Sequence, residues 1–257
     1  MINPNISIGP LTFHLYGAII AVAIYLGWNL VKKRAQTYKI PTKIFDDLAL
    51  LIPLFLAIIG ARLYHILHFW PLYWENPAQI IKITAGGLGI WGALAGIILG
   101  LWIFAKIKKI NFFSLLDLSA PSILLGQAIG RIGNYINQEG FGPPTELPWG
   151  VYIDPQHRPV QYLNSTHFHP TFFYEAALDL IFFLFILKIA GKFKQKGQVF
   201  GLYLIFYALS RFIAEFWRTD TWTVGSIKIA HILSIVAFAL GIWFFLIRPS
   251  KSLTTDH

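Results

Sequence analysis

The sequence carries a regularly spaced set of polar residues within an apolar segment near its C-terminal end. Tyr203, Tyr207, Arg211 and Glu215 are each four positions apart, and Arg218 extends the series. That spacing places the side chains in one stripe along a helix, where an arginine can bind an anion or pair with the glutamate one turn away. Because charged groups inside a membrane are costly, the stripe indicates a functional site, with a structural Arg211–Glu215 ion pair as the alternative.

A second polar concentration is the stretch 126–142, which holds five glycines. Its polar side chains include those of Arg131, Asn134, Asn137 and Glu139. Such a composition predicts a poor helix. Gly126 and Gly130 are four apart and predict close packing of another helix against that face. Backbone turns are expected at Gly133, Gly140 and Gly142. Polar groups crowded where a membrane span ends favour a functional site over a plain helix end.

The chain has 257 residues, of which 56% are hydrophobic and 13% are charged. Because soluble domains are about a quarter charged, this composition predicts an integral membrane protein. Cysteine is absent, which excludes a disulfide, a thiolate metal site and a cysteine nucleophile, so any thiol must come from a substrate. Zinc-type His/Glu spacing, a phosphate-binding loop and a dinucleotide fingerprint do not stand out either, and we predict no cofactor and no metal.

Seven apolar segments are long enough to cross a membrane as helices, since about 20 residues are needed. They lie at about 11–31, 45–68, 88–105, 112–130, 171–190, 199–217 and 227–247. We predict an all-α integral membrane protein with a single polytopic domain over residues 1–257. Asp117 and Pro121 interrupt the fourth segment, and the third contains a ridge of small residues at Gly92, Gly96 and Gly100.

Two connections have a composition of their own. Residues 69–84 are rich in aromatic side chains and are broken by Pro71 and Pro77, which predicts a segment at the membrane interface. Residues 131–170 form the one long polar connection, and their prolines and short apolar runs predict a small cap outside the membrane with a few short strands.

Lysine and arginine are distributed unevenly over the two ends of the predicted spans. Of 21 such residues, fourteen lie in the connections after spans one, three and five or in the C-terminal tail. Basic connections stay in the cytoplasm, so we predict an external N-terminus, a cytoplasmic C-terminus and a periplasmic cap. The net charge of +9 is therefore mainly a topology signal and does not indicate nucleic-acid binding.

This orientation places polar residues from six spans in the outer half of the membrane. They include Tyr16, Arg62, His65, Trp91, Arg131, Asn134, Glu139, His169, Tyr174, Glu175 and the stripe that begins at Tyr203. Several arginines in one layer indicate an anionic ligand, and a lipid phosphate is the anion most available there. Ordinary alternatives remain, namely Arg62 extending to the interface, Glu175 and Asp179 satisfying polar groups of the bundle, and His169 capping the fifth helix.

Residues 130–142 closely resemble the signature of the prolipoprotein diacylglyceryl transferase family. They read Gly-Arg-Ile-Gly-Asn-Tyr-Ile-Asn-Gln-Glu-Gly-Phe-Gly. Further similarity to the family runs along nearly the whole chain. It lies at His14-Leu15-Tyr16-Gly17, at Gly60-Ala61-Arg62, at His169-Pro170 with Tyr174-Glu175, and at Tyr207 with Arg211, Glu215 and Arg218.

The resemblance implies an enzyme of the bacterial inner membrane with an active site on the periplasmic side. Members of the family move the sn-1,2-diacylglyceryl group from phosphatidylglycerol to the thiol of the lipobox cysteine, which lies at the signal peptide of a prolipoprotein. The product is a thioether, and glycerol phosphate leaves. The implied partners are phosphatidylglycerol, the prolipoprotein and the lipid bilayer.

Site residues follow from the resemblance, position by position. It implies that Arg131 and Arg211 hold the phosphate. The candidate catalytic residues are Arg131, Glu139, Arg211, Tyr16 and His169. The candidate phosphatidylglycerol-binding residues are Arg131, Asn134, Arg211, Tyr207, Glu215 and Arg62.

The chain departs from the family motif at one position. Many members carry a histidine in a His-Gly-Gly-Leu motif of the third helix, where this chain has Trp91-Gly92-Ala93-Leu94. Tryptophan cannot accept a proton, so a mechanism with that histidine as the base cannot operate unchanged. Glu139 and His169 are the candidate bases, and Tyr16 is a candidate for relaying or orienting.

Two other classes of protein fit part of the pattern. A transporter of an anionic solute or lipid would also contain intramembrane Arg and Glu and glycine-broken helices. The polar groups lie in one leaflet rather than at the midplane, and no internal repeat is evident, which weighs against transport. A structural membrane protein needs no arginine cluster and would tolerate substitution of Arg131 and Arg211.

Overall fold

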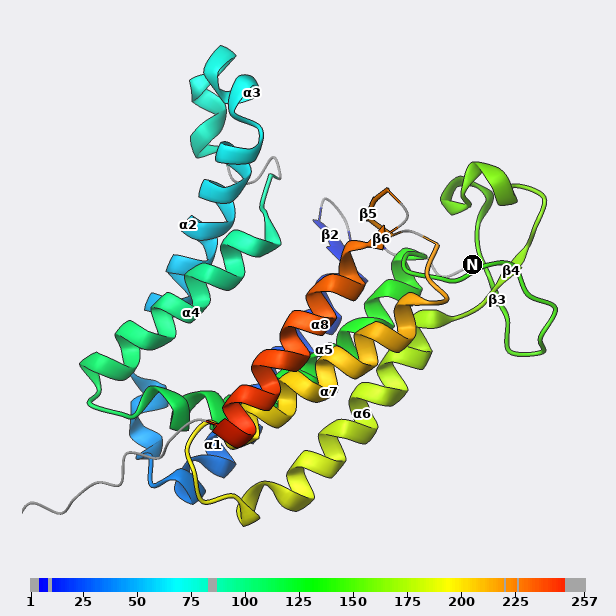
Figure 1. The fold of residues 1–257 in the computed structure, drawn as a ribbon. Helices are drawn as coiled ribbons and strands as arrows, with labels where there is room; N and C mark the ends of the chain where they lie inside the picture. The colour runs from blue at the N-terminus through cyan, green and yellow to red at the C-terminus, as the bar shows by residue number, and fades with distance from the viewer. Residues whose placement is uncertain (1–4, 9–10, 83–86, 220, 226, 248–257) are drawn as a thin grey trace, which may run out of the picture. The chain divides into compact units, whose positions relative to one another are not determined.

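The computed structural model describes residues 5–8, 11–82, 87–219, 221–225 and 227–247, and these residues fold mainly as helices (Figure 1). They form two compact units. One contains residues 1–34 and 116–257, and the other contains residues 35–115. The prediction of a single polytopic domain is not tested by this division and stays a prediction.

Five helical segments within the described residues are long and apolar enough to cross a membrane. They are Leu15–Tyr38, Leu48–His68, Ile90–Ile107, Phe112–Asn137 and Ile229–Leu246. The all-helical fold and these segments fit an integral membrane protein. Helices α6 (Thr171–Ile189) and α7 (Gln198–Glu215) have similar lengths but carry several charged residues. The predicted total of seven spans, and their orientation, stay predictions.

The unit of residues 35–115 is built on two closely packed helices, α2 (Leu51–His68) and α4 (Ile90–Ile107). A methyl group at Gly92 would lie 1.9 Å from the Gly60 carbonyl oxygen, and one at Gly96 would lie 2.0 Å from that of Leu56. The ridge of small residues therefore lets the two backbones approach. The other elements of this unit are η1 (Ala35–Tyr38), η2 (Thr42–Asp46), η3 (Leu48–Leu50), α3 (Trp70–Glu75) and η4 (Pro77–Ile81).

In its described residues, the other unit contains five long helices and three short hairpins. Its elements before the cap are β1 (Asn5–Ile8), β2 (Leu11–His14), α1 (Leu15–Arg34) and α5 (Phe112–Asn137), whose first turn belongs to the unit above. After α6 come η8 (Ala190–Lys192), α7, β5 (Thr223–Val224), β6 (Ile227–Lys228), α8 (Ile229–Ile242) and the π-helical segment η9 (Trp243–Ile247). Two predicted spans thus begin later than expected, because residues 11–14 and 227–228 pair as strands.

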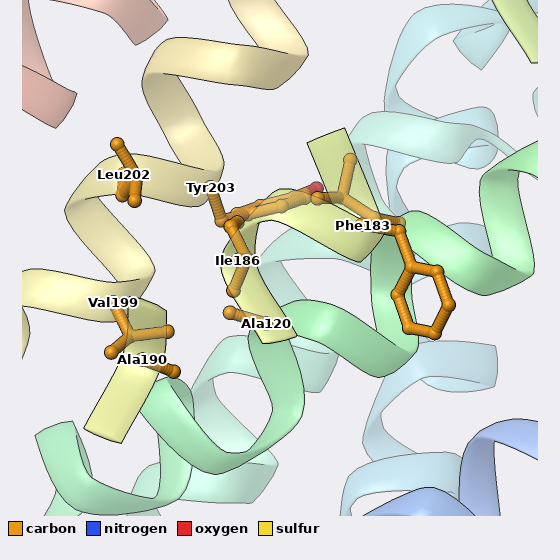
Figure 2. Close-up of a cluster of buried hydrophobic side chains, with 8 residues drawn as sticks. Ala120, Phe183, Ile186, Ala190, Val199, Leu202 and Tyr203 are labelled. Atoms are coloured by element: carbon orange, nitrogen blue, oxygen red, sulfur yellow. The ribbon is translucent and has the colours of Figure 1, made fainter. Parts of the chain in front are cut away.

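Helices α5, α6 and α7 share a hydrophobic core, shown in Figure 2. It contains Ala120, Leu124, Phe183, Ile186, Ala190, Val199, Leu202 and Tyr203. At the start of α7, Asp117 of α5 accepts the backbone N–H groups of Gly197 at 2.6 Å and Phe200 at 2.8 Å. A carboxylate at a helix N-terminus satisfies donors that have no partner within the helix. Asp117 therefore fixes α7 to α5.

The glycine-rich stretch differs from its prediction, because α5 continues as one helix through Pro121 and on to Asn137. A methyl group at Gly126 or Gly130 would have no described neighbour within 4 Å, so the predicted close packing of another helix is wrong at these two positions. Gly133 is helical and packs against Tyr16. The chain turns at Gln138, with φ 53°, and at Gly140, with φ 70°.

The cap accordingly begins after Asn137 rather than at residue 131. Strand β3 (Val151–Tyr152) pairs antiparallel with β4 (His167–Phe168). Pro144 forms an isolated antiparallel bridge with Phe168 of β4. Short strands were predicted here and are confirmed. Two 3₁₀ helices, η6 (Pro155–His157) and η7 (Val160–Tyr162), lie between the strands. The cap has its own apolar core of Phe141, Ile153, Phe168 and Phe172.

Candidate active site

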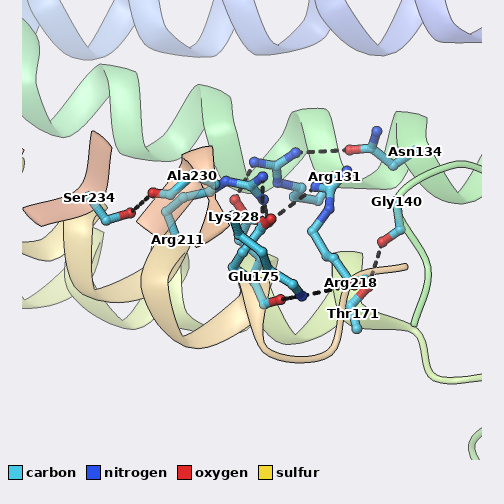
Figure 3. A network of polar contacts seen from close by, with 11 residues as sticks. Arg131, Asn134, Gly140, Thr171, Glu175, Arg211, Arg218, Lys228, Ala230 and Ser234 are labelled. Atoms are coloured by element: carbon cyan, nitrogen blue, oxygen red, sulfur yellow. Dashed lines mark hydrogen bonds and ion pairs between the residues drawn. The ribbon is translucent and has the colours of Figure 1, made fainter. Parts of the chain in front are cut away.

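Three arginines surround the carboxylate of Glu175 at one end of α6, and we call these four residues the arginine cluster (Figure 3). Arg131 of α5 donates from Nη2 to Oε1 of Glu175. Arg211 of α7 places Nη1 3.6 Å from Oε2, and Arg218 places Nη1 4.0 Å from the same oxygen. Glu175 is 2% exposed. Residues from three helical segments, far apart in the sequence, therefore meet at one buried carboxylate.

The second carboxylate beside these arginines is that of Glu215. Glu215 is fully buried and pairs with Arg211, with Nη2 2.7 Å from Oε2. The ion pair that the spacing offered as the structural alternative is thus present, and a functional role of the same residues stays a prediction. Three guanidinium groups therefore meet in one place, an arrangement that suits an anionic ligand.

Two arginines of the cluster keep donors that the protein does not use. Within the described residues, Nε of Arg131 and Nη1 of Arg211 are buried and have no hydrogen-bond acceptor. Buried donors are normally satisfied, and a phosphate offers several oxygens with the geometry that guanidinium groups prefer. These two nitrogens are therefore the donors best suited to a phosphate.

The end of α5 extends the cluster through two amides. Asn134 accepts from Nη1 of Arg131 at 3.2 Å and donates to Oε1 of Glu139 at 3.1 Å. Asn137 donates to the same oxygen at 3.3 Å. Glu139 is exposed, and its backbone N–H bonds to the Asn134 carbonyl. The structure thus brings Arg131 and Asn134, on the last turns of α5, together with Glu139, which lies two residues beyond the helix, and their roles stay predictions.

Tyr16 and Tyr207 lie on helices that adjoin the cluster. A methyl group at Gly133 would lie 2.5 Å from Cδ2 of Tyr16, so the Tyr16 ring packs directly on α5 two residues from Arg131. Tyr207 precedes Arg211 by one turn of α7 and stacks on Tyr203, with ring centroids 6.2 Å apart. The Tyr16 side chain remains 38% exposed. Both residues adjoin the cluster through their helices, and their roles stay predictions.

His169 lies at the beginning of α6, beside the turn that follows α5. Its carbonyl accepts from Gly142 N at 2.8 Å, and its Nδ1 lies 3.1 Å from the Tyr174 hydroxyl. A methyl group at Gly140 would lie 3.2 Å from Nη2 of Arg218. The glycine turn 140–142 therefore contacts both His169 and an arginine of the cluster.

Arg62 belongs to the other unit and has a different environment. It is 8% exposed and donates from Nε to the Ile80 carbonyl at 2.9 Å and from Nη1 to the Gly87 carbonyl at 2.9 Å. Its Nη2 donates to the Gln79 carbonyl. Arg62 is thus buried, and two of its acceptors, Gln79 and Ile80, lie in the segment 69–84 that was predicted at the membrane interface. These contacts fix that segment to α2, and the part of Arg62 in phosphatidylglycerol binding stays a prediction.

Sequence analysis missed two residues that support the arginine cluster. Lys228 donates to the backbone carbonyls of Glu215 at 2.6 Å and Arg218 at 3.2 Å, which satisfies acceptors at the end of α7. Thr171 donates to the Gly140 carbonyl and so ties α6 to the glycine turn. Neither contact had a local sequence signal, because each joins segments that the fold alone brings together.

An open cavity of about 680 Å³ lies in the cap, apart from the arginine cluster. It is lined by residues 144–148, 150 and 164–167. None of the candidate site residues lines it. The cavity therefore lies apart from the residues that the sequence predicts for the site.

Known proteins match this chain along most of its length. The family model described as prolipoprotein diacylglyceryl transferase matches residues 4–247. A phosphatidylglycerol–prolipoprotein diacylglyceryl transferase of Acaryochloris marina is 40% identical over 249 residues, covering 95% of this chain and 90% of the relative. One from a Nostoc species is 42% identical over 92% of this chain and 86% of the relative. One from Bacillus cereus is 36% identical over 95% of this chain and 90% of the relative. Because the family model and these relatives each match most of the chain, the chain belongs to the prolipoprotein diacylglyceryl transferase family.

Proposed function

We propose that this chain transfers the diacylglyceryl group of phosphatidylglycerol to the lipobox cysteine of prolipoproteins. The observation that carries the proposal is the arginine cluster, in which two buried donors have no acceptor among the described residues. A phosphodiester would supply the missing acceptors. The names of the relatives agree with this substrate and do not favour transport of an anion.

The reaction joins a sulfur to a carbon and releases a phosphate ester. The chain has no cysteine, so the thiol belongs to the prolipoprotein. Its reference pKa of about 8.5 leaves only a few per cent as thiolate near neutral pH, so a base is needed. As the carbon–sulfur bond forms, the carbon–oxygen bond breaks and its electron pair goes to the phosphate oxygen. The thiol proton goes to Glu139 or His169.

Arg131 and Arg211 stabilise the charge that develops on the departing phosphate. Fixed donors in a water-poor site commonly provide the largest single contribution to catalysis. Glu175 holds the three guanidinium groups together before the lipid binds, since like charges would otherwise repel one another. Phosphate oxygens then add to, or partly replace, the carboxylate contacts of Arg131.

The site would lie at the periplasmic side of the bacterial inner membrane. The distribution of basic residues supports an external N-terminus and seven spans, with α6 and α7 crossing the membrane despite their charges. Residues 138–170 would form a periplasmic cap above the bundle. Phosphatidylglycerol would reach the arginines from the bilayer, and the prolipoprotein would bring its cysteine from the same side.

Purified full-length protein in detergent, phosphatidylglycerol and a lipobox peptide would test the proposal. Mass spectrometry would look for a diacylglyceryl adduct on the cysteine. The adduct should be absent with a Cys→Ser peptide and with Arg131→Ala, and present with Arg158→Lys, a change in the cap outside the cluster. No adduct from folded, lipid-bound protein would reject the function, and an adduct with unimpaired Arg131→Ala would reject the site.

A further inference from the structure

The hydroxyl of Tyr174 lies between two side chains that come from different parts of the cap. Trp149 precedes β3, and its Nε1 lies 2.9 Å from the Tyr174 oxygen. His169 follows β4, and its Nδ1 lies 3.1 Å from the same oxygen. The histidine and tyrosine rings meet edge-on, with 65° between their planes. The three residues therefore form a hydrogen-bonded chain that runs from the cap to the first turn of α6.

The donors and acceptors of these groups limit the direction of the chain. An indole N–H can only donate, so the Tyr174 oxygen accepts from Trp149. The phenol has one proton of its own, and among the described side chains Nδ1 of His169 is the acceptor in contact with it. Where the phenol proton occupies this contact, Nδ1 accepts and the proton of a neutral imidazole lies on Nε2. This tautomer is assigned from the hydrogen-bonding capacity of the three groups.

The backbone around His169 is fixed by the glycine turn. His169 N donates to the Pro143 carbonyl at 3.0 Å, and the His169 carbonyl accepts from Gly142 at 2.8 Å. A methyl group at Gly142 would lie 2.8 Å from Cβ of His169 and 2.6 Å from the Trp217 carbonyl oxygen. Gly142 thus permits an approach that a side chain would block. It brings His169 beside the end of α7, where Arg218 follows Trp217.

We propose that Trp149 and Tyr174 are positioning residues that hold His169 as the neutral Nε2–H tautomer, so that His169 donates a hydrogen bond to the substrate phosphate. This inference rests on the proposed transferase function. In this tautomer Nε2 has no lone pair with which to take the thiol proton. Among the described residues no side chain or backbone group bonds to Nε2, so its N–H remains for a phosphate oxygen.

The proposal decides between the two candidate bases. His169 keeps its proton throughout the reaction and stabilises the phosphate as a neutral donor. The thiol proton goes to the carboxylate of Glu139 while the carbon–sulfur bond forms. The electron pair of the broken carbon–oxygen bond goes to the phosphate oxygen, which the arginines and His169 face as donors. A neutral imidazole is sufficient as a hydrogen-bond donor to the phosphate, because the guanidinium groups supply the positive charge.

Nitrogen NMR of the full chain in detergent, labelled with ¹⁵N-histidine, would test the tautomer directly. His169→Gln identifies the signal. Wild type should show a protonated Nε2 and an unprotonated, hydrogen-bonded Nδ1. Tyr174→Phe should raise the Nδ1–H population several-fold, and Trp149→Phe should raise it less. Tyr152→Phe, a tyrosine of the same cap outside the chain, should keep the wild-type signal. Protonated Nδ1 in wild type would overturn the proposal.

Transfer kinetics would test the role of the tautomer. Glutamine has an N–H donor but no basic nitrogen, so His169→Gln should keep kcat within about tenfold of wild type, whereas His169→Ala should fall further. Tyr174→Phe should lower kcat about tenfold, consistent with one hydrogen bond. Equal and near-complete loss in His169→Gln and His169→Ala, from folded protein, would identify His169 as the base and overturn the proposal. If wild type itself transfers nothing while the NMR result holds, the proposed function fails and the hydrogen-bonded chain stands.

Discussion

Arg62 and Arg131 both project from long apolar helices, but their guanidinium groups have different partners. Arg62 bonds to the backbone carbonyls of Gln79, Ile80 and Gly87, which cannot move away without unfolding the segment that carries them. Arg131 bonds to the side chains of Glu175 and Asn134. A carboxylate and an amide can reorient or share a donor with a ligand, whereas a backbone carbonyl in a folded segment cannot.

The difference distinguishes an arginine that builds the protein from one that can bind. The Arg62 contacts involve all three of its guanidinium nitrogens, while Arg131 keeps a buried Nε without a described acceptor. Removing Arg62 should therefore affect folding first, and removing Arg131 should affect chemistry first.

The largest effect is expected for Arg131→Lys. Lysine keeps the charge but loses the planar fork that can bond Glu175, Asn134 and a phosphate together. We expect kcat/KM to fall at least about a hundredfold, as for loss of a donor to a developing oxyanion, with a normal amount of protein in the membrane. Steady-state transfer to a lipobox peptide measures the loss. Arg158→Lys is the matched control, and equal rates for the two variants would remove Arg131 from the mechanism.

Arg62→Lys should affect stability more than chemistry. An ammonium group cannot reach the carbonyls of Gln79, Ile80 and Gly87 together, and each buried acceptor left without a donor costs about 1–3 kcal/mol. We expect a lower Tm in detergent and fewer folded molecules, with kcat per folded molecule within about tenfold of wild type. Unchanged Tm with lost binding of phosphatidylglycerol would instead place Arg62 in the lipid site and break the contrast with Arg131.

Part of this contrast was accessible from the sequence. The four-residue spacing of Arg211 and Glu215 indicated their ion pair as the structural alternative to a functional site, and the spacing of Arg131 and Asn134 places them on one helical face, because helix geometry is local. The meeting of Arg131 with Glu175 joins residues 44 positions apart, so periodicity alone did not predict the contact. The environment of Arg62 was also missed, since backbone carbonyls are present at every residue and leave no mark in the sequence.

The glycine-rich stretch shows the same limit. Its composition predicted turns, yet α5 remains helical to Asn137, because its polar side chains find partners along the helix. The ridge at Gly92, Gly96 and Gly100 and the pair Gly126 and Gly130 have the same spacing. Only the ridge faces a neighbouring backbone. Spacing therefore identifies a face that can pack closely, and the tertiary fold decides whether another helix lies there.

A smaller and more specific effect is expected for Glu175→Gln. The change removes the negative charge that Arg131, Arg211 and Arg218 share, so the charge of the cluster becomes more positive by one. We expect tighter binding of anionic lipid and a lower kcat, because Arg131 loses the group that orients it. Binding of phosphatidylglycerol vesicles measured beside vesicles of a zwitterionic lipid separates charge from general lipid affinity. Weaker binding to the anionic vesicles would show that Glu175 does not compete with phosphate.

The smallest effect is expected at an ion pair outside the apolar helices. Lys108 hydrogen-bonds Asp47 and lowers the pKa of that carboxyl below its usual value, with help from the N–H of Ala49. A carboxyl with a lowered pKa contributes stability at pH values above its pKa in the unfolded chain. This contribution disappears as the pH falls through the pKa of the carboxyl in the folded chain.

Because the pair is solvent-accessible, Asp47→Asn should change Tm little at neutral pH. The substitution should not change Tm at a pH where Asp47 is protonated in both the folded and the unfolded chain. Thermal unfolding from pH 7 to pH 3 would test this, with transfer activity unchanged at neutral pH. A Tm loss at pH 7 as large as that of Arg62→Lys would show that exposed charges, and not only buried arginines, hold this unit together.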